Sequence, residues 1–171
     1  PEKFNYKGVE YTPKSFAASL GLDYNDYIEI GSFTHHPFYE TFMLEVPDNW
    51  LHAQIYNVTL DEMIAIMDKA LEDGYTIGWG SDVSEKGFSW KNGVAIVPDA
   101  EKKDLSGTEK EKWEKLTPAE KAAATYSFDG TAKEKVITQE MRQEGFDNFS
   151  TTDDHGMHIV GLFKDVNGNK F

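Results

Sequence analysis

The sequence predicts an α+β fold, because segments with helical patterning alternate with short segments of strand character. The clearest helix opens with the capping box at residues 59–62, where a Thr and a Glu side chain satisfy backbone amides, and it ends at Gly74. Strands are expected over residues 75–80 and over residues 157–163, where successive side chains would face opposite sides. Inside the helix, apolar residues recur at helical spacing: Met63, Ile64, Met67 and Leu71.

The N-terminal third contains a second set of local signals. Thr12 is a good N-cap, Pro13 suits the first helical position, and Gly21 is a natural stop, so a helix is predicted between them. A short strand is expected over residues 27–30. Residues 31–58 are rich in aromatic residues, Pro and His without a sustained period, which predicts a long, well-packed irregular segment.

The middle of the chain is charged, and its composition indicates helices. A short strand is expected over residues 93–97, after which residues 99–145 are dominated by Lys, Glu, Ala and Thr. This stretch is interpreted as a charged helical insertion or divergent segment with a solvent-facing surface. It contains a capping box at residues 117–120 and a short helix over residues 138–144 that Gly145 closes.

Composition restricts the possible functions. With 171 residues and 39% hydrophobic content, residues 1–171 are expected to form a single domain, and the Pro1 start and the apparent strand at the end indicate a fragment of a longer polypeptide. The net charge of -13 argues against nucleic acid as a partner. The absence of Cys excludes a disulfide, a thiolate metal site and a thiol nucleophile within the chain. No run approaches the roughly eighteen apolar residues of a membrane span.

The most informative motif lies at residues 151–161, Thr-Thr-Asp-Asp-His-Gly-Met-His-Ile-Val-Gly. It places His155 at the mouth of a strand, preceded by acidic residues and followed by small and apolar ones. An imidazole in such a place suits a general base, and a thiol peptidase needs one to activate its thiol and to protonate the leaving amine. A hairpin turn is expected at residues 165–169, with a second strand starting near Lys170.

This run resembles the histidine region of papain-like cysteine peptidases, and specifically that of bleomycin hydrolase and bacterial aminopeptidase C. Further segments are similar in kind and order to that family, so the resemblance covers most of the chain. It is weakest over residues 99–145. The supporting segments are residues 11–16, 22–27, 59–74 and 78–83.

The resemblance implies a papain-like α+β fold, represented mainly by the antiparallel-sheet half-domain with flanking helices. It implies a cysteine-type aminopeptidase, a hydrolase acting in proteolysis, with His155 as catalytic general base and acid and Asp154 as a supporting residue in the site. A purely structural role is an equally good interpretation of Asp154. The family's nucleophilic Cys would lie upstream, and its orienting Asn just beyond Phe171, so the chain alone is expected to be inactive.

The family also implies peptide substrates, no cofactor or metal, a homo-oligomer that is hexameric in relatives, no membrane association and a cytoplasmic location. An export signal upstream of Pro1 would change that location. One alternative is a non-catalytic pseudopeptidase with a binding or assembly role. A less favoured one is a metal-dependent hydrolase that uses the Asp153–His155 run with His158, although strand alternation would place the two His on opposite faces. Three Trp residues could stack a ligand but are more simply core or half-buried: Trp50, Trp79 and Trp90.

Overall fold

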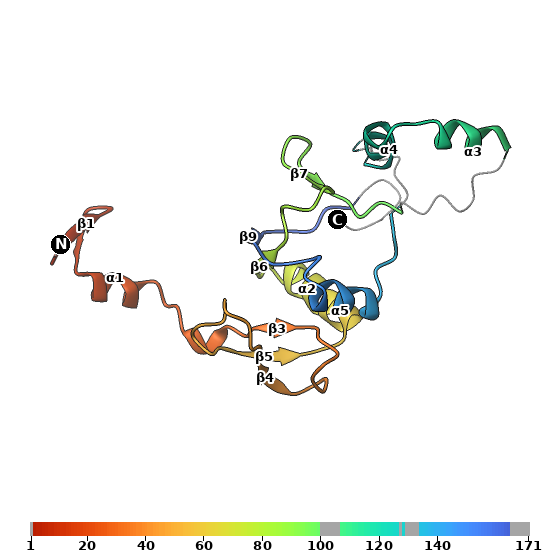
Figure 1. The fold of residues 1–171 in the computed structure, drawn as a ribbon. Coiled ribbons are helices and arrows are strands. Elements are labelled where there is room, and N and C mark those ends of the chain that lie inside the picture. Colours follow the sequence, from red (N-terminus) through yellow and green to blue (C-terminus); the bar gives the residue numbers. More distant parts are fainter. Residues whose placement is uncertain (1, 100–106, 127, 129–133, 165–171) are drawn as a thin grey trace. The chain divides into compact units, whose positions relative to one another are not determined.

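A computed structural model describes residues 2–99, 107–126, 128 and 134–164. The fold is α+β, with small sheets, mostly antiparallel, and several helices (Figure 1), which confirms the predicted class at this level. Contacts separate the chain into two compact units, Pro1–Thr59 and Leu60–Phe171. The expectation of a single domain over residues 1–171 stays a prediction. Among the described residues, none of the helices has the length and apolar character to cross a bilayer.

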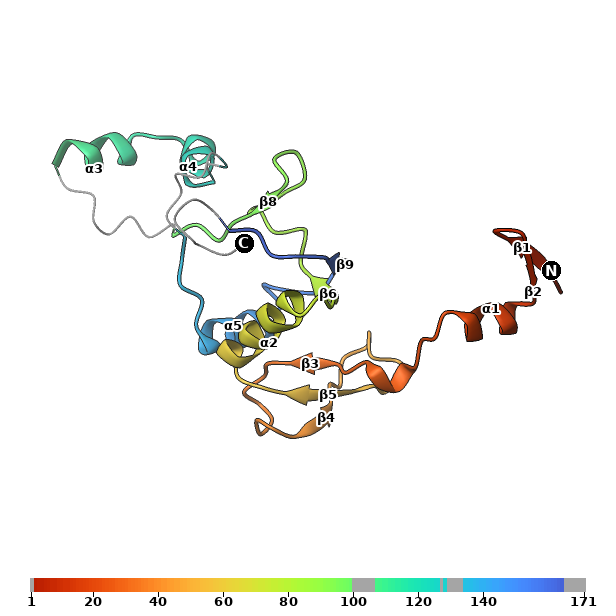
Figure 2. The ribbon, with the colours of Figure 1, turned by 180° about the vertical axis from the view of Figure 1, so that it is seen from behind.

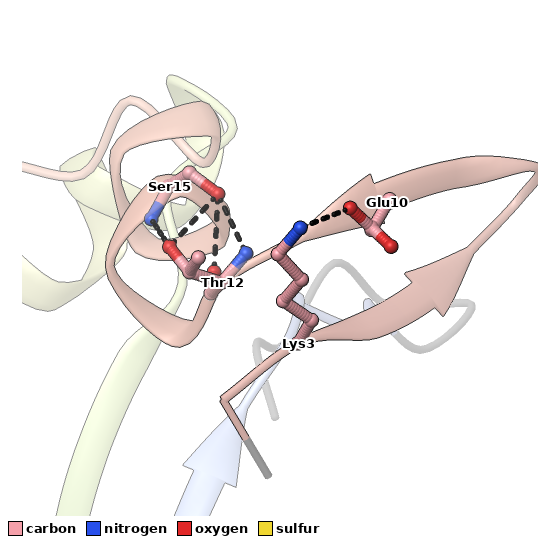
Figure 3. A network of polar contacts seen from close by, with 4 residues as sticks. All are labelled: Lys3, Glu10, Thr12 and Ser15. Carbon is pink, nitrogen blue, oxygen red and sulfur yellow. Dashed lines mark hydrogen bonds and ion pairs between the residues drawn. The ribbon is translucent and has the colours of Figure 1, made fainter.

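The first unit opens with a hairpin and a helix. An ion pair of 2.8 Å joins Lys3 and Glu10 across the hairpin (Figure 3). Thr12 caps the helix as predicted: its hydroxyl accepts the Ser15 N–H at 3.1 Å, and the Ser15 hydroxyl accepts the Thr12 N–H at 2.9 Å (Figure 3). The ring of Phe16 packs against three hairpin rings, so local contacts hold this motif together. The elements are β1 (Phe4–Tyr6), β2 (Val9–Tyr11) and α1 (Pro13–Ser19).

The prediction of an irregular segment over residues 31–58 is wrong, because these residues contain two strands of a three-stranded sheet of order β3-β5-β4. In Figures 1 and 2, β5 lies between β3 and β4; it is parallel to β3 and antiparallel to β4. These strands are too short to show a two-residue period in the sequence. The strand expected over residues 27–30 begins only at Ile30, after a 3₁₀ turn. The elements are η1 (Tyr24–Asp26), β3 (Ile30–Gly31), β4 (Thr41–Met43) and β5 (Gln54–Asn57).

The core of this unit surrounds a buried amide. Asn57 is fully buried at the end of β5. Its side-chain oxygen accepts the Phe33 N–H at 2.9 Å, and its side-chain nitrogen donates to the carbonyl of Phe33 at 2.8 Å and to those of His36 and Pro37 at 3.1 Å each. Phe33, Ile55 and Val58 are buried around it. One side chain therefore fixes the turn that connects β3 to β4.

The second unit begins with the long helix α2 (Leu60–Glu72), which confirms the predicted helix. The Leu60 N–H donates to the side-chain oxygen of Gln139 at 2.7 Å, so α5 (Gln139–Asp147) contributes a cap to α2 from a distant part of the chain. Thr138, expected as the first residue of this helix, is its N-cap, and Gly145 does not close the helix, which continues to Asp147. A Cβ at Gly145 would lie 3.2 Å from the Thr151 hydroxyl, so this glycine serves a close approach rather than a helix end.

The strands of this unit are shorter than the sequence predicts. The expected strand over residues 157–163 begins earlier and ends at Ile159, since β6 is the strand that β9 pairs with among the described residues, and Val160 and Phe163 beyond it are exposed. The strand expected over residues 93–97 is reduced to the short β8, which pairs with β7. The elements are β6 (Ile77–Ser81), β7 (Phe88–Ser89), β8 (Val94–Ala95) and β9 (His155–Ile159).

Within the charged segment, the structure describes α3 (Gly107–Glu114) and α4 (Pro118–Thr125). The predicted capping box of α4 is confirmed, because the Thr117 hydroxyl accepts the Glu120 N–H at 3.3 Å and the Glu120 carboxylate accepts the Thr117 N–H at 2.8 Å. The hairpin turn expected at residues 165–169 and the strand expected near Lys170 lie outside the described residues.

Candidate active site

His155 is the first residue of β9 and lies opposite Ser81, the last residue of β6. Directly paired residues of an antiparallel ladder share a face, so His155 lies on the face that also carries two partly buried apolar pairs. These pairs are Trp79 with Met157 and Ile77 with Ile159. The imidazole thus stands exposed at the end of an apolar face, and His158, paired with Gly78, lies on the opposite face, as the strand alternation predicts.

Asp154 bonds to the backbone at the end of β6. Its N–H donates to the Ser81 carbonyl at 3.1 Å, and its carboxylate accepts the Val83 N–H at 2.9 Å. These two bonds extend the β6–β9 pairing by one residue and set the direction in which the chain enters His155. The structure therefore supports the structural interpretation of Asp154, while a role in tuning the catalytic ion pair stays a prediction.

Asp82 makes the reverse contact: its side chain, just after β6, bonds to the backbone that precedes β9. The sequence did not predict this role. Its carboxylate accepts the Thr152 N–H at 2.9 Å, the Ser84 N–H at 3.0 Å and the Ser84 hydroxyl at 2.7 Å. The bond from the Thr152 backbone lowers the pKa of Asp82, and the bond from the Ser84 hydroxyl lowers it further. The Asp-x-Ser spacing could have indicated the local bonds, but nothing local points to Thr152.

Two further contacts anchor the segment before His155. The Thr151 hydroxyl donates to the Glu85 carboxylate at 2.9 Å, and the Thr151 N–H donates to the Gly145 carbonyl at 3.1 Å. We call residues 151–155 the histidine segment. It is joined to the residues after β6 by Asp82, Asp154 and Glu85, and to α5 by Gly145. Its path is therefore set by bonds made on two sides.

The His155 imidazole contacts the indole of Trp90, with ring centroids 5.8 Å apart and planes at 87°. Trp90 follows β7 and is 67% exposed, so it is not the core or half-buried residue that composition suggested. Its position beside His155 could not be read from the sequence, because a tryptophan in a short polar turn carries no signal for a distant partner. Within the described part of the chain, no hydrogen bond is made by the His155 side chain.

This arrangement can exchange protons but holds no thiol nucleophile of its own. An exposed imidazole can accept and return a proton, and the 171 residues contain no Cys. Over the described ranges, no three side chains of His, Cys, Asp or Glu converge as metal ligands, so Asp153, Asp154, His155 and His158 do not form the cluster that a metal-dependent hydrolase would use.

The remaining histidines lie in the first unit and have packing partners. His36 stacks on Phe42 with centroids 4.1 Å apart, and His35 packs edge-on against Phe33. The Nδ1 atom of His52 lies 3.2 Å from the sulfur of Met43. Aromatic packing therefore accounts for the His35-His36 pair.

Searches of family models and of curated proteins found no match to this chain. The features that bear on function are therefore the histidine segment and its pairing with β6.

Proposed function

We propose that these residues form the histidine-bearing part of a cysteine-type aminopeptidase of the bleomycin hydrolase kind, in a papain-like fold. The observation that carries the proposal is the pairing of β6 with β9. Residues 78–83 and 151–161 each resemble the family, and they lie about seventy positions apart in sequence, as the separation of Asp154 from Val83 illustrates. A chance likeness of two unrelated segments would not require them to be hydrogen-bonded neighbours.

The reaction follows from the chemistry of an imidazole beside a thiol. His155 takes the proton of a cysteine thiol, and the thiolate attacks the carbonyl carbon of the first peptide bond. The carbon–nitrogen bond breaks as the His155 imidazolium gives its proton to the leaving amine, which yields a thioester. Water, deprotonated by the same imidazole, then hydrolyses the thioester and restores the thiol.

The thiol would have to come from outside these 171 residues, since they contain no Cys. By the same resemblance, we propose peptides as substrates, a homo-oligomeric and hexameric assembly, and a cytoplasmic location. The net charge of -13 supports the proposal that nucleic acid is not a partner.

The first experiment compares His155→Ala with His158→Ala in the full-length protein, using aminoacyl-coumarin substrates. Both changes remove an imidazole from β9, but only His155 lies on the face proposed for catalysis. We expect His155→Ala to lower kcat/KM by at least a thousandfold, because proton transfer fails in both chemical steps. His158→Ala should stay within a few-fold of the wild type. Equal activity of the two variants would refute the assignment of His155, as would turnover by the 171-residue chain alone.

Inhibitors separate the proposed enzyme from its rivals. A thiol-alkylating reagent should abolish the activity and excess chelator should not, whereas a metal-dependent hydrolase would respond in the opposite way. A full-length protein that folds but lacks the upstream Cys and any turnover would instead be the non-catalytic pseudopeptidase.

A further inference from the structure

Trp90 is the aromatic neighbour of the proposed catalytic imidazole. The centroids of the Trp90 and His155 rings lie 5.8 Å apart, and their planes are nearly perpendicular at 87°. This is the edge-to-face geometry that aromatic pairs favour. We infer that Trp90 is a positioning residue that holds the His155 imidazole in its working orientation; the catalytic meaning of this contact rests on the proposed function.

Trp90 is itself held in place by its hairpin. It opens the turn between β7 and β8, which is closed by a bond of 2.9 Å from the Gly93 N–H to the Ser89 carbonyl. The Asn92 side-chain nitrogen also donates to the Ser89 hydroxyl at 2.7 Å. Phe88 supports the indole from one side, with centroids 5.0 Å apart and planes at 64°. The position of the indole is therefore set by the hydrogen bonds of the turn and by the contact with Phe88.

The base of this hairpin is tied to the histidine segment. The Glu85 carboxylate accepts the Thr151 hydroxyl at 2.9 Å, and the Glu85 carbonyl accepts the Phe88 N–H at 3.0 Å. At the same level, the Gly87 carbonyl accepts the Ile96 N–H at 3.0 Å. A Cβ at Gly87 would lie 1.9 Å from the Ile96 carbonyl oxygen, so only glycine allows this close approach. Both rings of the pair thus belong to segments that are bonded to each other.

A packed neighbour matters here because the His155 side chain is exposed at a strand end and, within the described residues, makes no hydrogen bond. An unrestrained imidazole would sample several rotamers, of which only some point a ring nitrogen at the thiol. Contact with the indole removes part of that freedom before substrate binds. Rotamer restriction affects the chemical step more than ground-state binding of the peptide.

The direct test is an NMR measurement on the 171-residue chain, which needs no catalysis. An indole in contact with the imidazole shifts the His155 ring protons by its ring current and gives cross-relaxation to them. We expect Trp90→Leu to move the His155 ring protons toward free-histidine values and Trp90→Phe to keep part of the shift. Trp50→Leu is the matched control, because Trp50 is also an exposed tryptophan and belongs to the other unit. His155 ring shifts that do not respond to Trp90→Leu would overturn the inference.

The kinetic test uses the full-length protein. Trp90→Leu should lower kcat by roughly tenfold to a hundredfold, the scale of loss from a small misplacement of a catalytic group, with KM changed little. Trp90→Phe should recover most of the rate, and Trp50→Leu should leave it unchanged. An active enzyme in which Trp90→Leu keeps the wild-type kcat refutes the positioning role and leaves the proposed function standing. A folded wild type without turnover refutes the proposed function, while the NMR test still decides whether Trp90 holds the ring.

Discussion

The turn at residues 33–40 and the histidine segment are both irregular stretches fixed by side chains that bond to the backbone, but the groups that hold them differ. The turn is held by the neutral, fully buried amide of Asn57. The histidine segment is held by the carboxylates of Asp82, which is half-buried, and of Asp154 and Glu85, which are exposed. Buried amide bonds are shielded from water and carry no charge to titrate, whereas water and protons compete for carboxylates that water can reach. The first stretch is thus held by bonds that do not titrate, and the second is held by bonds that acid can weaken.

The largest effect is expected for Asn57→Ala, which tests how strongly the buried amide holds the turn at residues 33–40. The change removes the bonds that the Asn57 side chain makes to the Phe33 N–H and carbonyl in a buried site. An unsatisfied buried polar group costs about 1–3 kcal/mol, so a loss of about 3 kcal/mol or more in the free energy of unfolding is expected. Urea unfolding followed by circular dichroism measures it.

Asn49→Ala is the matched control. Asn49 also bonds the backbone with both ends of its amide, accepting the Ala53 N–H at 2.8 Å and donating to the Leu44 carbonyl at 3.0 Å. It is only partly buried, so water can replace the lost partner and a loss of about 1 kcal/mol is expected. Equal losses for the two variants would show that burial does not distinguish the two amides.

The next effect concerns the response of the histidine segment to pH. The pKa of Asp82 is lowered in the folded chain, mainly by the Thr152 N–H bond. Its contribution to stability is therefore fully present above the ordinary aspartate pKa of about 4 and is lost as pH falls through the lowered folded value. Acidification should increase amide exchange at Thr152 relative to the intrinsic rate at each pH.

Asp82→Asn should remove most of this pH dependence, because the amide side chain can still accept a bond but does not titrate. Asp153→Asn is the control, since its carboxylate does not hold the Thr152 amide. If the Thr152 amide keeps the same acid-induced loss of protection in Asp82→Asn, a group other than Asp82 causes the pH dependence of the histidine segment.

The sequence predicted the parts of the fold that depend on local signals. The helices that follow Thr12 and Thr117 were found because capping residues and a proline lie within four positions of each other. Strands β4 and β5 were missed because their pairing joins residues that no short window contains. Gly145 was misread as a helix end, because the reason for it lies at Thr151 and outside the helix.

The same distinction holds for the candidate site. His155 could be found because a motif in one continuous run carries it. Asp82 and Trp90 could not, because the Thr152 bond to Asp82 spans seventy positions and the ring contact of Trp90 spans a similar distance. Side chains that position a catalytic group generally come from other elements, so a single sequence reveals the reacting group more readily than the residues that hold it.

The smallest effect is expected at Gly145, where the histidine segment packs on α5. Replacing a helical glycine with alanine usually stabilises a helix by roughly 1 kcal/mol. At Gly145 the added Cβ would lie 3.2 Å from the Thr151 hydroxyl oxygen and 3.4 Å from its Cβ, a tight contact that offsets the gain. Gly145→Ala alone should therefore change the free energy of unfolding by less than about 0.5 kcal/mol. In a Thr151→Ala background, where the hydroxyl is gone, the same change should stabilise by up to about 1 kcal/mol. The double-mutant cycle measures this coupling directly, and perfect additivity would mean that the Thr151 side chain does not limit the space at Gly145.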